Sequence, residues 1–402
     1  MLAAMIFVAR VLGKEAYGEL GMIQSTISML GVLAGFGLGL TATKHVAEMR
    51  KSDPEKAGRI LVLSGVIAIA SGALMASVLF LLAPWLAEKT IAAPHLTNHL
   101  RIGALILFIS ALNGAQNGAL SGFEAFRAIA GVNFATGIAS FPIILAGAYW
   151  GGLVGIVWAL AASMGLGLFL GHIALRREAA RAGLPLTLQG IQNEWHVLWR
   201  FTIPAALSGI LVVPVNWVCA AFLVNGPGGY PEMGIFNAAN QIFSFLILLP
   251  LVLGRVLLPV LANEWNDNRP LAMKLLMLAV KTNLYVLTPL IILGCVLSPY
   301  IMALYGESFE SGWPTLVIVL VTAGFVAANV PMGHILAASS QMWIGFAMNA
   351  GWAIVFVIGT ILLVRYGSIG VASARAIAYV IHTGWVFAFA NRLKKAYQVV
   401  PV

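Results

Sequence analysis

The chain is divided into runs of about 20 apolar residues separated by short polar breaks. Of its 402 residues, 60% are hydrophobic and only 9% are charged, whereas about a quarter of the residues in a soluble domain are charged. A run of about 20 apolar residues is long enough for one helix to cross a bilayer, and alternating β-barrel strands do not produce such runs. The sequence therefore predicts an all-α, polytopic membrane protein.

Eleven complete spans are predicted, together with the remnant of a twelfth. They are expected near residues 20–40, 60–83, 103–121, 128–149, 153–175, 201–224, 234–257, 275–298, 314–336, 344–364 and 370–390. Residues 1–9 resemble the last third of a further helix, because so short a segment at about 1.5 Å rise per residue cannot cross a core of about 30 Å. We therefore expect a truncated first helix or a late chain start. A cleaved signal peptide fits poorly, since no basic residue precedes this apolar stretch.

The basic residues fall mostly on one side of the predicted spans. One set of breaks contains five of them, namely Arg10, Lys14, Lys89, Arg101 and Arg365. The opposite set contains sixteen, namely Lys44, Arg50, Lys51, Lys56, Arg59, Arg127, Arg176, Arg177, Arg181, Arg200, Arg255, Arg269, Lys274, Arg392, Lys394 and Lys395. Because basic residues in short loops resist translocation, the second side and the C-terminus are predicted to be cytoplasmic. The net charge of +9 is thereby explained without nucleic-acid binding.

The two halves of the sequence resemble each other at an offset of 216 residues. The offset aligns Gly18 with Gly234, Glu48 with Glu264, Pro54 with Pro270, Leu120 with Leu336, Asn133 with Asn349 and Gly151 with Gly367. With the remnant counted, each half has six helices, so the halves share one topology and are expected to be related by a pseudo-two-fold axis along the membrane normal. This predicts an N-lobe at 1–175, a C-lobe at 201–391 and a cytoplasmic tail at 392–402.

The longest cytoplasmic break joins the two predicted lobes. Its sequence, RREAARAGLPLTLQGIQNEWHVLWR at 176–200, mixes basic residues with leucine and tryptophan. This pattern is typical of an amphipathic helix that lies on an anionic leaflet. We therefore expect an interfacial linker helix over this range.

Three segments carry a resemblance to a known family, namely ARVLGKEAYGELGM at 9–22, GFGLGLTATKHVAEMRKSDPEKAGRIL at 35–61 and LSGFEAFR at 120–127. They resemble the polysaccharide and O-antigen (Wzx-type) flippases of the multidrug/oligosaccharidyl-lipid/polysaccharide (MOP) superfamily. The resemblance implies a flippase that moves undecaprenyl-pyrophosphate-linked oligosaccharide, an O-antigen or exopolysaccharide unit, to the periplasmic leaflet of the bacterial inner membrane. Alternating access of two rocking lobes would carry the substrate across.

Cations, but no acids, are predicted at membrane depth. All fourteen acidic residues lie in loops or at span ends, whereas Lys281 and Arg375 lie inside spans and Arg255 lies near a span end. A charge at mid-bilayer costs at least about 2.5–3.5 kcal/mol, so it usually faces a wet cavity or a partner. The pyrophosphate of the substrate is the expected counter-ion, since guanidinium groups bind phosphate oxygens in pairs. Snorkelling to the headgroups is the alternative interpretation.

Other candidate residues have less specific patterns. Arg10 and Lys44 are proposed for the cavity rim and the cytoplasmic exit, and His382 for proton coupling, since a histidine pKa can cross the physiological range. Pro250 and Pro259 are proposed as a hinge, because each proline removes a backbone hydrogen bond. No cofactor, disulfide or metal site is expected, since Cys219 and Cys295 both lie in apolar spans.

Two other functions compete with the flippase. A cation-coupled multidrug exporter would need an intramembrane carboxylate, and a membrane polymerase or glycosyltransferase would need catalytic polar groups gathered in a sizeable loop; the sequence shows neither. We therefore expect a transporter rather than an enzyme. Its expected partners are lipid-linked oligosaccharide, membrane lipids and other polysaccharide-assembly proteins, and it is expected to act as a monomer.

Overall fold

The computed structural model describes residues 2–35, 38–195, 211–338 and 341–398, and within these ranges the regular elements are all helices. Contacts divide the chain into two compact units. The first contains residues 3–12 and 19–217, and the second contains residues 2, 13–18 and 218–402. The prediction of an all-α protein is confirmed.

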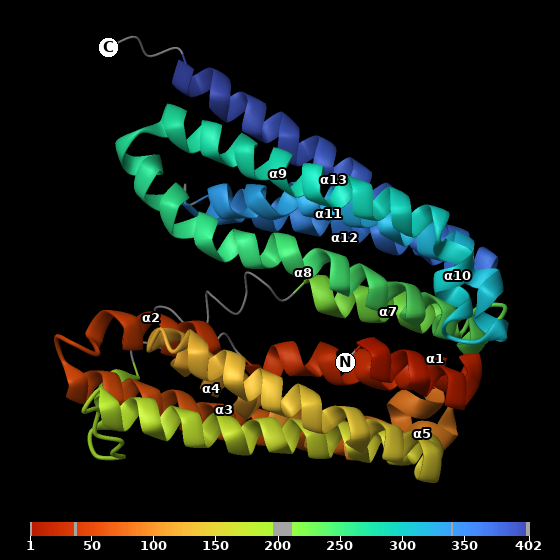
Figure 1. The fold of residues 1–402 in the computed structure, drawn as a ribbon, viewed down its shortest axis with the longest axis horizontal. Coiled ribbons are helices and arrows are strands. Elements are labelled where there is room, and N and C mark those ends of the chain that lie inside the picture. Colours follow the sequence, from red (N-terminus) through yellow and green to blue (C-terminus); the bar gives the residue numbers. More distant parts are fainter. Residues whose placement is uncertain (1, 36–37, 196–210, 339–340, 399–402) are drawn as a thin grey trace. The chain divides into compact units, whose positions relative to one another are not determined.

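The first unit is built mainly from four long helices. Along the chain lie α1 (Leu2–Gly35), α2 (Leu38–Met49), α3 (Pro54–Trp85), η1 (Leu86–Thr90), η2 (Pro94–Leu96), α4 (Thr97–Gly122), α5 (Phe126–Arg181) and η3 (Ile191–Glu194). Helix α1 is interrupted at Gly13, where φ is 74°, and its residues 13–18 belong to the second unit. Helix α5 reverses at Gly152, so that its two arms lie side by side (Figure 1).

The second unit repeats this plan. It contains the part of α7 (Val212–Val224) from residue 218 onward, followed by α8 (Gly229–Asp267), α9 (Arg269–Val296), α10 (Ser298–Ala303), η5 (Glu307–Gly312), α11 (Trp313–Ala338), α12 (Met342–Leu363), η6 (Val364–Tyr366) and α13 (Gly367–Gln398). A buried hydrophobic cluster joins α8, α9, α11 and α13 through side chains such as Leu261, Leu276, Met332 and Val386.

Seven helical stretches among the described residues are long and apolar enough to cross a membrane, or eight if the bent pair α1 and α2 is counted as one span. Two of the seven, at 126–181 and 343–393, are 56 and 51 residues long. Each exceeds the roughly 20 residues of one crossing and contains a reversal, so each is long enough for two. The arms of α5 match the predicted spans 128–149 and 153–175, whereas the predicted span 201–224 is described only from residue 211.

The reversals in the two units have the same backbone conformation. Gly152 has φ 53° and ψ −136°, and Gly367 has φ 62° and ψ −140°. Positive φ is readily available only to glycine, which explains a glycine at both sites. The structure therefore aligns Gly367 with Gly152 at an offset of 215, and the alignment with Gly151 was wrong by one residue. The helix caps at Asp53 and Asn268, with φ of −146° and −147°, also match at 215.

Gly18 and Gly234, aligned by the offset of 216, are in close contact within the second unit. A Cβ atom at Gly18 would overlap the carbonyl oxygen of Tyr230, and one at Gly234 would overlap the carbonyl oxygen of Lys14. Lys14 and Tyr230 are themselves related by 216, so the two contacts are reciprocal.

The predicted linker helix over 176–200 is not present as one helix. Residues 176–181 end α5, residues 182–190 are not helical, and η3 follows. Gly183 and Gly190 adopt positive φ of 65° and 79°, and Pro185 lies between them, so the backbone leaves the helical conformation despite the amphipathic composition. Residues 196–200 lie outside the described ranges.

An ion pair attaches this segment to α3. Arg59 donates from Nε and Nη2 to Oε1 of Glu194, both at 3.2 Å, and the Glu194 side chain is only 4% exposed. Removing one partner of a buried pair leaves an uncompensated charge and costs about 3–5 kcal/mol. We expect Arg59→Ala to lower the free energy of unfolding by about this amount, measured by thermal unfolding in detergent.

The exposed pair Arg181–Glu178 supplies the matched control. Exposed ion pairs contribute about 0–1 kcal/mol, so Arg181→Ala should leave the unfolding midpoint nearly unchanged. Equal effects of the two substitutions would contradict a structural role for the Arg59–Glu194 pair.

Candidate functional site

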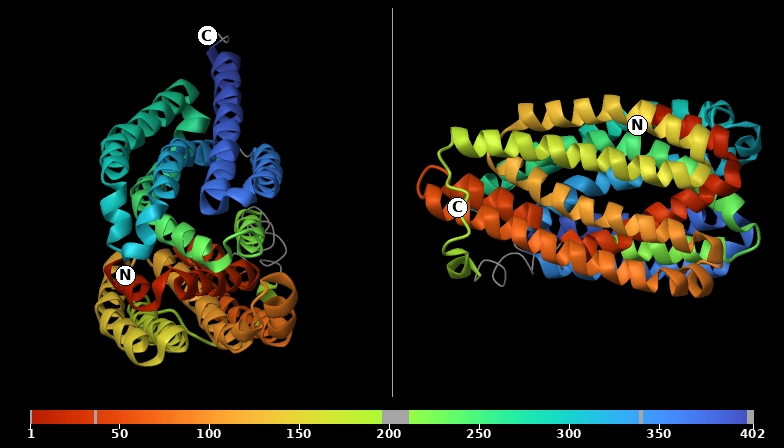
Figure 2. Two further views of the ribbon diagram at one scale, coloured as in Figure 1. Left: turned by 90° about the vertical axis from the view of Figure 1, so that its right-hand side faces the viewer. Right: turned by 90° about the horizontal axis from the view of Figure 1, so that it is seen from below.

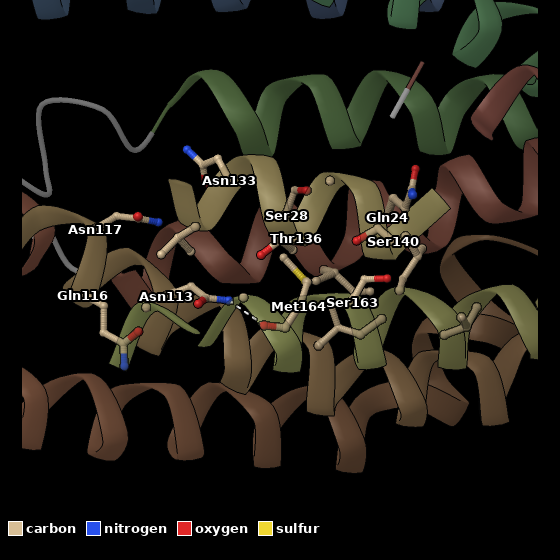
Figure 3. A pocket seen from close by; sticks show the side chains of 18 of the residues that line it. Gln24, Ser28, Asn113, Gln116, Asn117, Asn133, Thr136, Ser140, Ser163 and Met164 are labelled. Carbon is tan, nitrogen blue, oxygen red and sulfur yellow. Dashed lines mark hydrogen bonds between the residues drawn. The ribbon is translucent and has the colours of Figure 1, made fainter. Parts of the chain in front are cut away.

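A polar cavity of about 600 Å³ lies inside the first unit. Its volume is within the range of about 300–1,000 Å³ that is typical of small-molecule sites. Helices α1, α4 and both arms of α5 line it (Figure 3). The polar side chains that line it are Gln24, Ser28, Asn113, Gln116, Asn117, Asn133, Thr136, Ser140 and Ser163. None of its lining residues is charged or aromatic.

Helical spacing places these side chains on facing surfaces. Asn113, Gln116 and Asn117 stand three and four residues apart on α4, and Thr136 and Ser140 stand four apart on α5, so each set shares one helix face. Figure 3 shows the amides of α4 and Asn133 gathered toward one end of the cavity and the hydroxyls toward the other.

Few of these polar groups are paired within the described protein. Asn113 Nδ2 donates to the carbonyl oxygen of Met164 at 3.1 Å. By contrast, Gln116 Oε1, Thr136 Oγ1 and Ser163 Oγ are buried without a hydrogen-bond partner. Leaving a buried polar group unpaired costs about 1–3 kcal/mol, so such groups usually meet water or a ligand.

A groove of about 650 Å³ in the second unit combines cations with apolar side chains, and we call it the basic groove. It is lined by α9 and α13 through Arg269, Pro270, Met273, Lys274, Met277, Leu278, Lys281, Phe387, Ala390 and Asn391. In Figure 2 (left) the C-terminal part of α13 stands away from α9. No carboxylate lines the groove, and neither lysine has an ion-pair partner among the described residues.

Arg269 differs from the two lysines of the basic groove. Its Nε donates to the carbonyl oxygen of Trp265 at 3.3 Å, and its guanidinium lies 5.6 Å from the centre of that ring. Lys274 and Lys281 are exposed, seven residues apart on one face of α9. The basic groove is therefore suited to an amphiphile with an anionic head and an apolar tail.

Arg375 lies elsewhere, buried between α8 and α13 with only 5% of its surface exposed. Nη1 donates to Oδ1 of Asn240 at 2.7 Å, and the guanidinium lies 5.1 and 5.0 Å from the ring centres of Phe236 and Phe243. Nε and Nη2 have no partner in the described protein. The predicted cations Lys281 and Arg375 thus occupy different sites. In this conformation an anion reaches Arg375 only if the surrounding helices separate.

The other predicted cations are not gathered around either of these sites. Arg10 lies on the first arm of α1 and Lys44 on α2, and both are exposed. Arg255 lies in α8, but its side chain is outside the described part of the structure. Their roles toward substrate remain predictions.

His382 and the two hinge prolines also remain predictions. The side-chain amide of Asn329 lies 3.3 Å from His382 Nδ1 and donates to Thr383 Oγ1 at 2.9 Å. Pro250 and Pro259 lie within α8, which is helical without interruption from Gly229 to Asp267. Pro250 is buried, and the side chain of Pro259 is not described.

The polar cavity was not predicted from the sequence, because only charged residues within the spans were taken as candidate binding residues. The pattern that could have revealed it consists of uncharged side chains. Amides and hydroxyls recur at three- and four-residue spacing within α4 and the first arm of α5. In the described residues, no group of three or more His, Cys, Asp and Glu side chains could hold a metal ion.

Solved structures match this fold of two helical units with repeated topology. The chain superimposes with a TM-score of 0.80 on an inward-facing multidrug resistance MATE family transporter of the MOP superfamily, at 16% identity, covering 98% of this chain and 94% of that one. It superimposes with a TM-score of 0.71 on the lipid II flippase MurJ, at 15% identity, covering 97% and 84% of the two chains. The predicted two-lobed MOP fold is confirmed.

Sequence comparison gives the family. Residues 2–265 match the polysaccharide biosynthesis protein family, and the chain belongs to it. A relative from Ralstonia nicotianae (strain ATCC BAA-1114 / GMI1000), the EPS I polysaccharide export inner membrane protein EpsE, is 24% identical over 393 residues, with 92% of this chain and 85% of that protein covered. The namesake from Ralstonia solanacearum is 22% identical, with the same coverage. The resemblance stated from the sequence is thus confirmed.

Proposed function

We propose that the protein is a flippase for polyprenyl-pyrophosphate-linked oligosaccharide, an O-antigen or exopolysaccharide unit. It works in the bacterial inner membrane, exposes the cargo alternately to the cytoplasmic and periplasmic sides, and has a cytoplasmic C-terminus. Membership of the polysaccharide biosynthesis family supports the substrate class. The likeness to MurJ shows that the fold is shared with a lipid II flippase.

The basic groove is the observation that carries the proposal. A polyprenyl pyrophosphate has several negative charges followed by a long apolar chain. Lys274 and Lys281 offer ammonium groups to phosphate oxygens, and Met273, Met277 and Phe387 line the same groove with apolar surface. The groove lies near the N-terminal end of α9, which the charge distribution places on the cytoplasmic side, where the substrate is made.

Among those of the five cations whose side chains are described, Lys281 alone lines this groove. Arg255, Arg375, Arg10 and Lys44 remain proposed contacts for the same headgroup in other states of the transport cycle. Burial of Arg375 without a carboxylate partner fits a cation that meets its counter-ion only when the helices around it open.

A cation-coupled multidrug exporter is the competing function, because a MATE transporter shares the fold. No carboxylate lines the polar cavity or the basic groove. A cationic drug would therefore find no opposite charge in either place, and we favour the anionic lipid-linked substrate.

The test is transport by the full-length protein in proteoliposomes. Lipid-linked oligosaccharides extracted from the cells that encode the protein would be incorporated, and flipping would be followed by the reaction of their sugars with impermeant periodate. We expect exchange of the saccharide between leaflets at a rate well above that of protein-free liposomes. Efflux of cationic dyes without saccharide flipping would favour the drug exporter, and chain lengthening would indicate a polymerase.

A further inference from the structure

We propose that the polar cavity of the first unit binds the carbohydrate portion of the lipid-linked saccharide. This inference rests on the proposed function and assigns its substrate to two separate sites. The pyrophosphate belongs to the basic groove of the second unit, and the sugars belong to the polar cavity of the first.

The chemistry of the cavity matches carbohydrate better than any charged or aromatic ligand. Sugar hydroxyls both donate and accept hydrogen bonds, and amide and hydroxyl side chains do the same. The absence of cations from the lining removes a counter-ion for phosphate, and the absence of carboxylates removes one for a cationic drug. Val132 and Met164 also line the cavity and are partly exposed, so they offer apolar contact to the C–H faces of sugar rings.

Three polar groups of the cavity have no hydrogen-bond partner among the described residues. Ser163 is only 4% exposed, and its Oγ has no hydrogen bond among the described residues. Thr136 Oγ1 and Gln116 Oε1 are also buried and unpaired. Sugar hydroxyls, which both donate and accept hydrogen bonds, are suitable partners for such groups.

The aligned positions of the second unit carry different side chains. The offset is 216 where α4 and α11 begin and end and where α5 and α12 begin, and it is 215 after the reversal. These local offsets align Thr136 with Trp352, Ser140 with Phe356 and Met164 with Tyr379. In the second unit these are aromatic side chains, with Trp352 centred 5.5 Å from Phe356 and 5.3 Å from Tyr379.

One aligned amide differs in the same direction. Asn240, aligned with Gln24, accepts from Arg375, whereas Gln24 lines the cavity. Asn329 and its counterpart Asn113 both donate within the protein, to Thr383 and to the carbonyl oxygen of Met164. Because the second unit achieves a similar helix arrangement with buried rings at Trp352 and Phe356, the fold does not require small polar side chains at these positions. We attribute their retention to binding.

Filling the cavity with the residues of the second unit is the sharpest test. Thr136→Trp combined with Ser140→Phe would occupy the space with rings that the aligned positions already carry. In proteoliposomes we expect at least a tenfold slower flipping of extracted lipid-linked oligosaccharide. Binding of bare undecaprenyl pyrophosphate, measured in detergent, should remain at the wild-type level. Thr322→Val, which removes a buried hydroxyl of α11 that donates to its own helix, is the matched control and should change neither.

A second variant removes hydrogen bonding without adding volume, in case the filled cavity prevents folding. Thr136→Val with Ser163→Ala should weaken binding of the saccharide-bearing lipid several-fold and leave the bare lipid unaffected. Wild-type flipping in both variants, or an equal loss for both lipids, would overturn the assignment of the sugars to this cavity. Failure of the unaltered protein to flip any lipid-linked saccharide would instead refute the proposed function.

Discussion

Replacing Gly18 by leucine is expected to abolish the stable folded protein. A Cβ atom at this position would overlap the carbonyl oxygen of Tyr230 and lie 2.8 Å from the amide nitrogen of Gly234. Both neighbours are backbone atoms of α8, so the clash is relieved only if the helices separate. Overpacking of a buried crossing is among the mechanisms that reach about 4 kcal/mol or more. We expect a collapse of monodisperse protein in size-exclusion chromatography and of the thermal unfolding midpoint.

The reciprocal variant and a matched control sharpen this test. Gly234→Leu should be equally harmful, because its Cβ would overlap the carbonyl oxygen of Lys14. At Gly384, also helical and also in the second unit, a Cβ would meet no atom within 4 Å. Leucine there should be tolerated, since it raises helix propensity by up to about 1 kcal/mol. Wild-type stability of the Gly18 variant would show that the crossing of α1 and α8 is not formed as described.

The helices were predictable because their cause is local. A span needs about 20 apolar residues, and this requirement is visible in the sequence without any knowledge of packing. The reversal in α5 illustrates the limit. The sequence suggested a break between two spans there, but it did not decide whether Gly151 or Gly152 adopts positive φ, because that choice depends on how the two arms pack.

The prediction of a linker helix was wrong for a different reason. Amphipathic composition over 176–200 favours an interfacial helix only if the backbone permits one, and Gly183, Pro185 and Gly190 do not. The contact between Arg59 and Glu194 then fixes the segment against α3, at a sequence distance of 135 residues that composition cannot reveal.

The candidate sites, too, were predictable only where a single residue gives a clear signal in the sequence. Lys281 was recognised from its charge alone, because a cation in an apolar run is rare. Arg269 and Lys274, which line the same groove, were interpreted only as markers of membrane orientation. They lie at the end of a span, where basic residues are common. The neutral polar cavity was not foreseen at all, because serine, asparagine and glutamine are tolerated in membrane helices for packing reasons as well.

The two units therefore share a fold but differ in the side chains that line their cavities and grooves. In the second unit, the rings of Trp352, Phe356 and Tyr379 pack together, and Arg269, Lys274 and Lys281 lie in a groove between α9 and α13. In the first unit, the interior is open, polar and uncharged. A lipid-linked saccharide has the same two chemical parts, a charged diphosphate on an apolar chain and a neutral polar glycan.

Neutralising the two lysines of the basic groove is expected to weaken binding of polyprenyl pyrophosphate about a hundredfold. Hydrogen bonds that involve charged groups contribute about 1.5–3 kcal/mol each, and about 1.4 kcal/mol corresponds to a factor of ten. We therefore expect each of Lys274→Gln and Lys281→Gln to weaken binding about tenfold or more. The double variant should weaken it about a hundredfold. Binding of bare undecaprenyl pyrophosphate to the purified protein in detergent is the measurement.

Charge, rather than shape, should account for this loss. The arginine variants Lys274→Arg and Lys281→Arg keep the charge and should keep most of the affinity, and Lys51→Gln, in an exposed loop of the first unit, should have no effect. Because dissolved salt screens exposed charges, wild-type affinity should fall as ionic strength rises, and the double glutamine variant should respond less. An unchanged affinity in that variant, or a salt response equal to that of the wild type, would remove the basic groove as the headgroup site. The anion would then have to bind at Arg375 or Arg255, and substitutions at those positions would carry the whole effect.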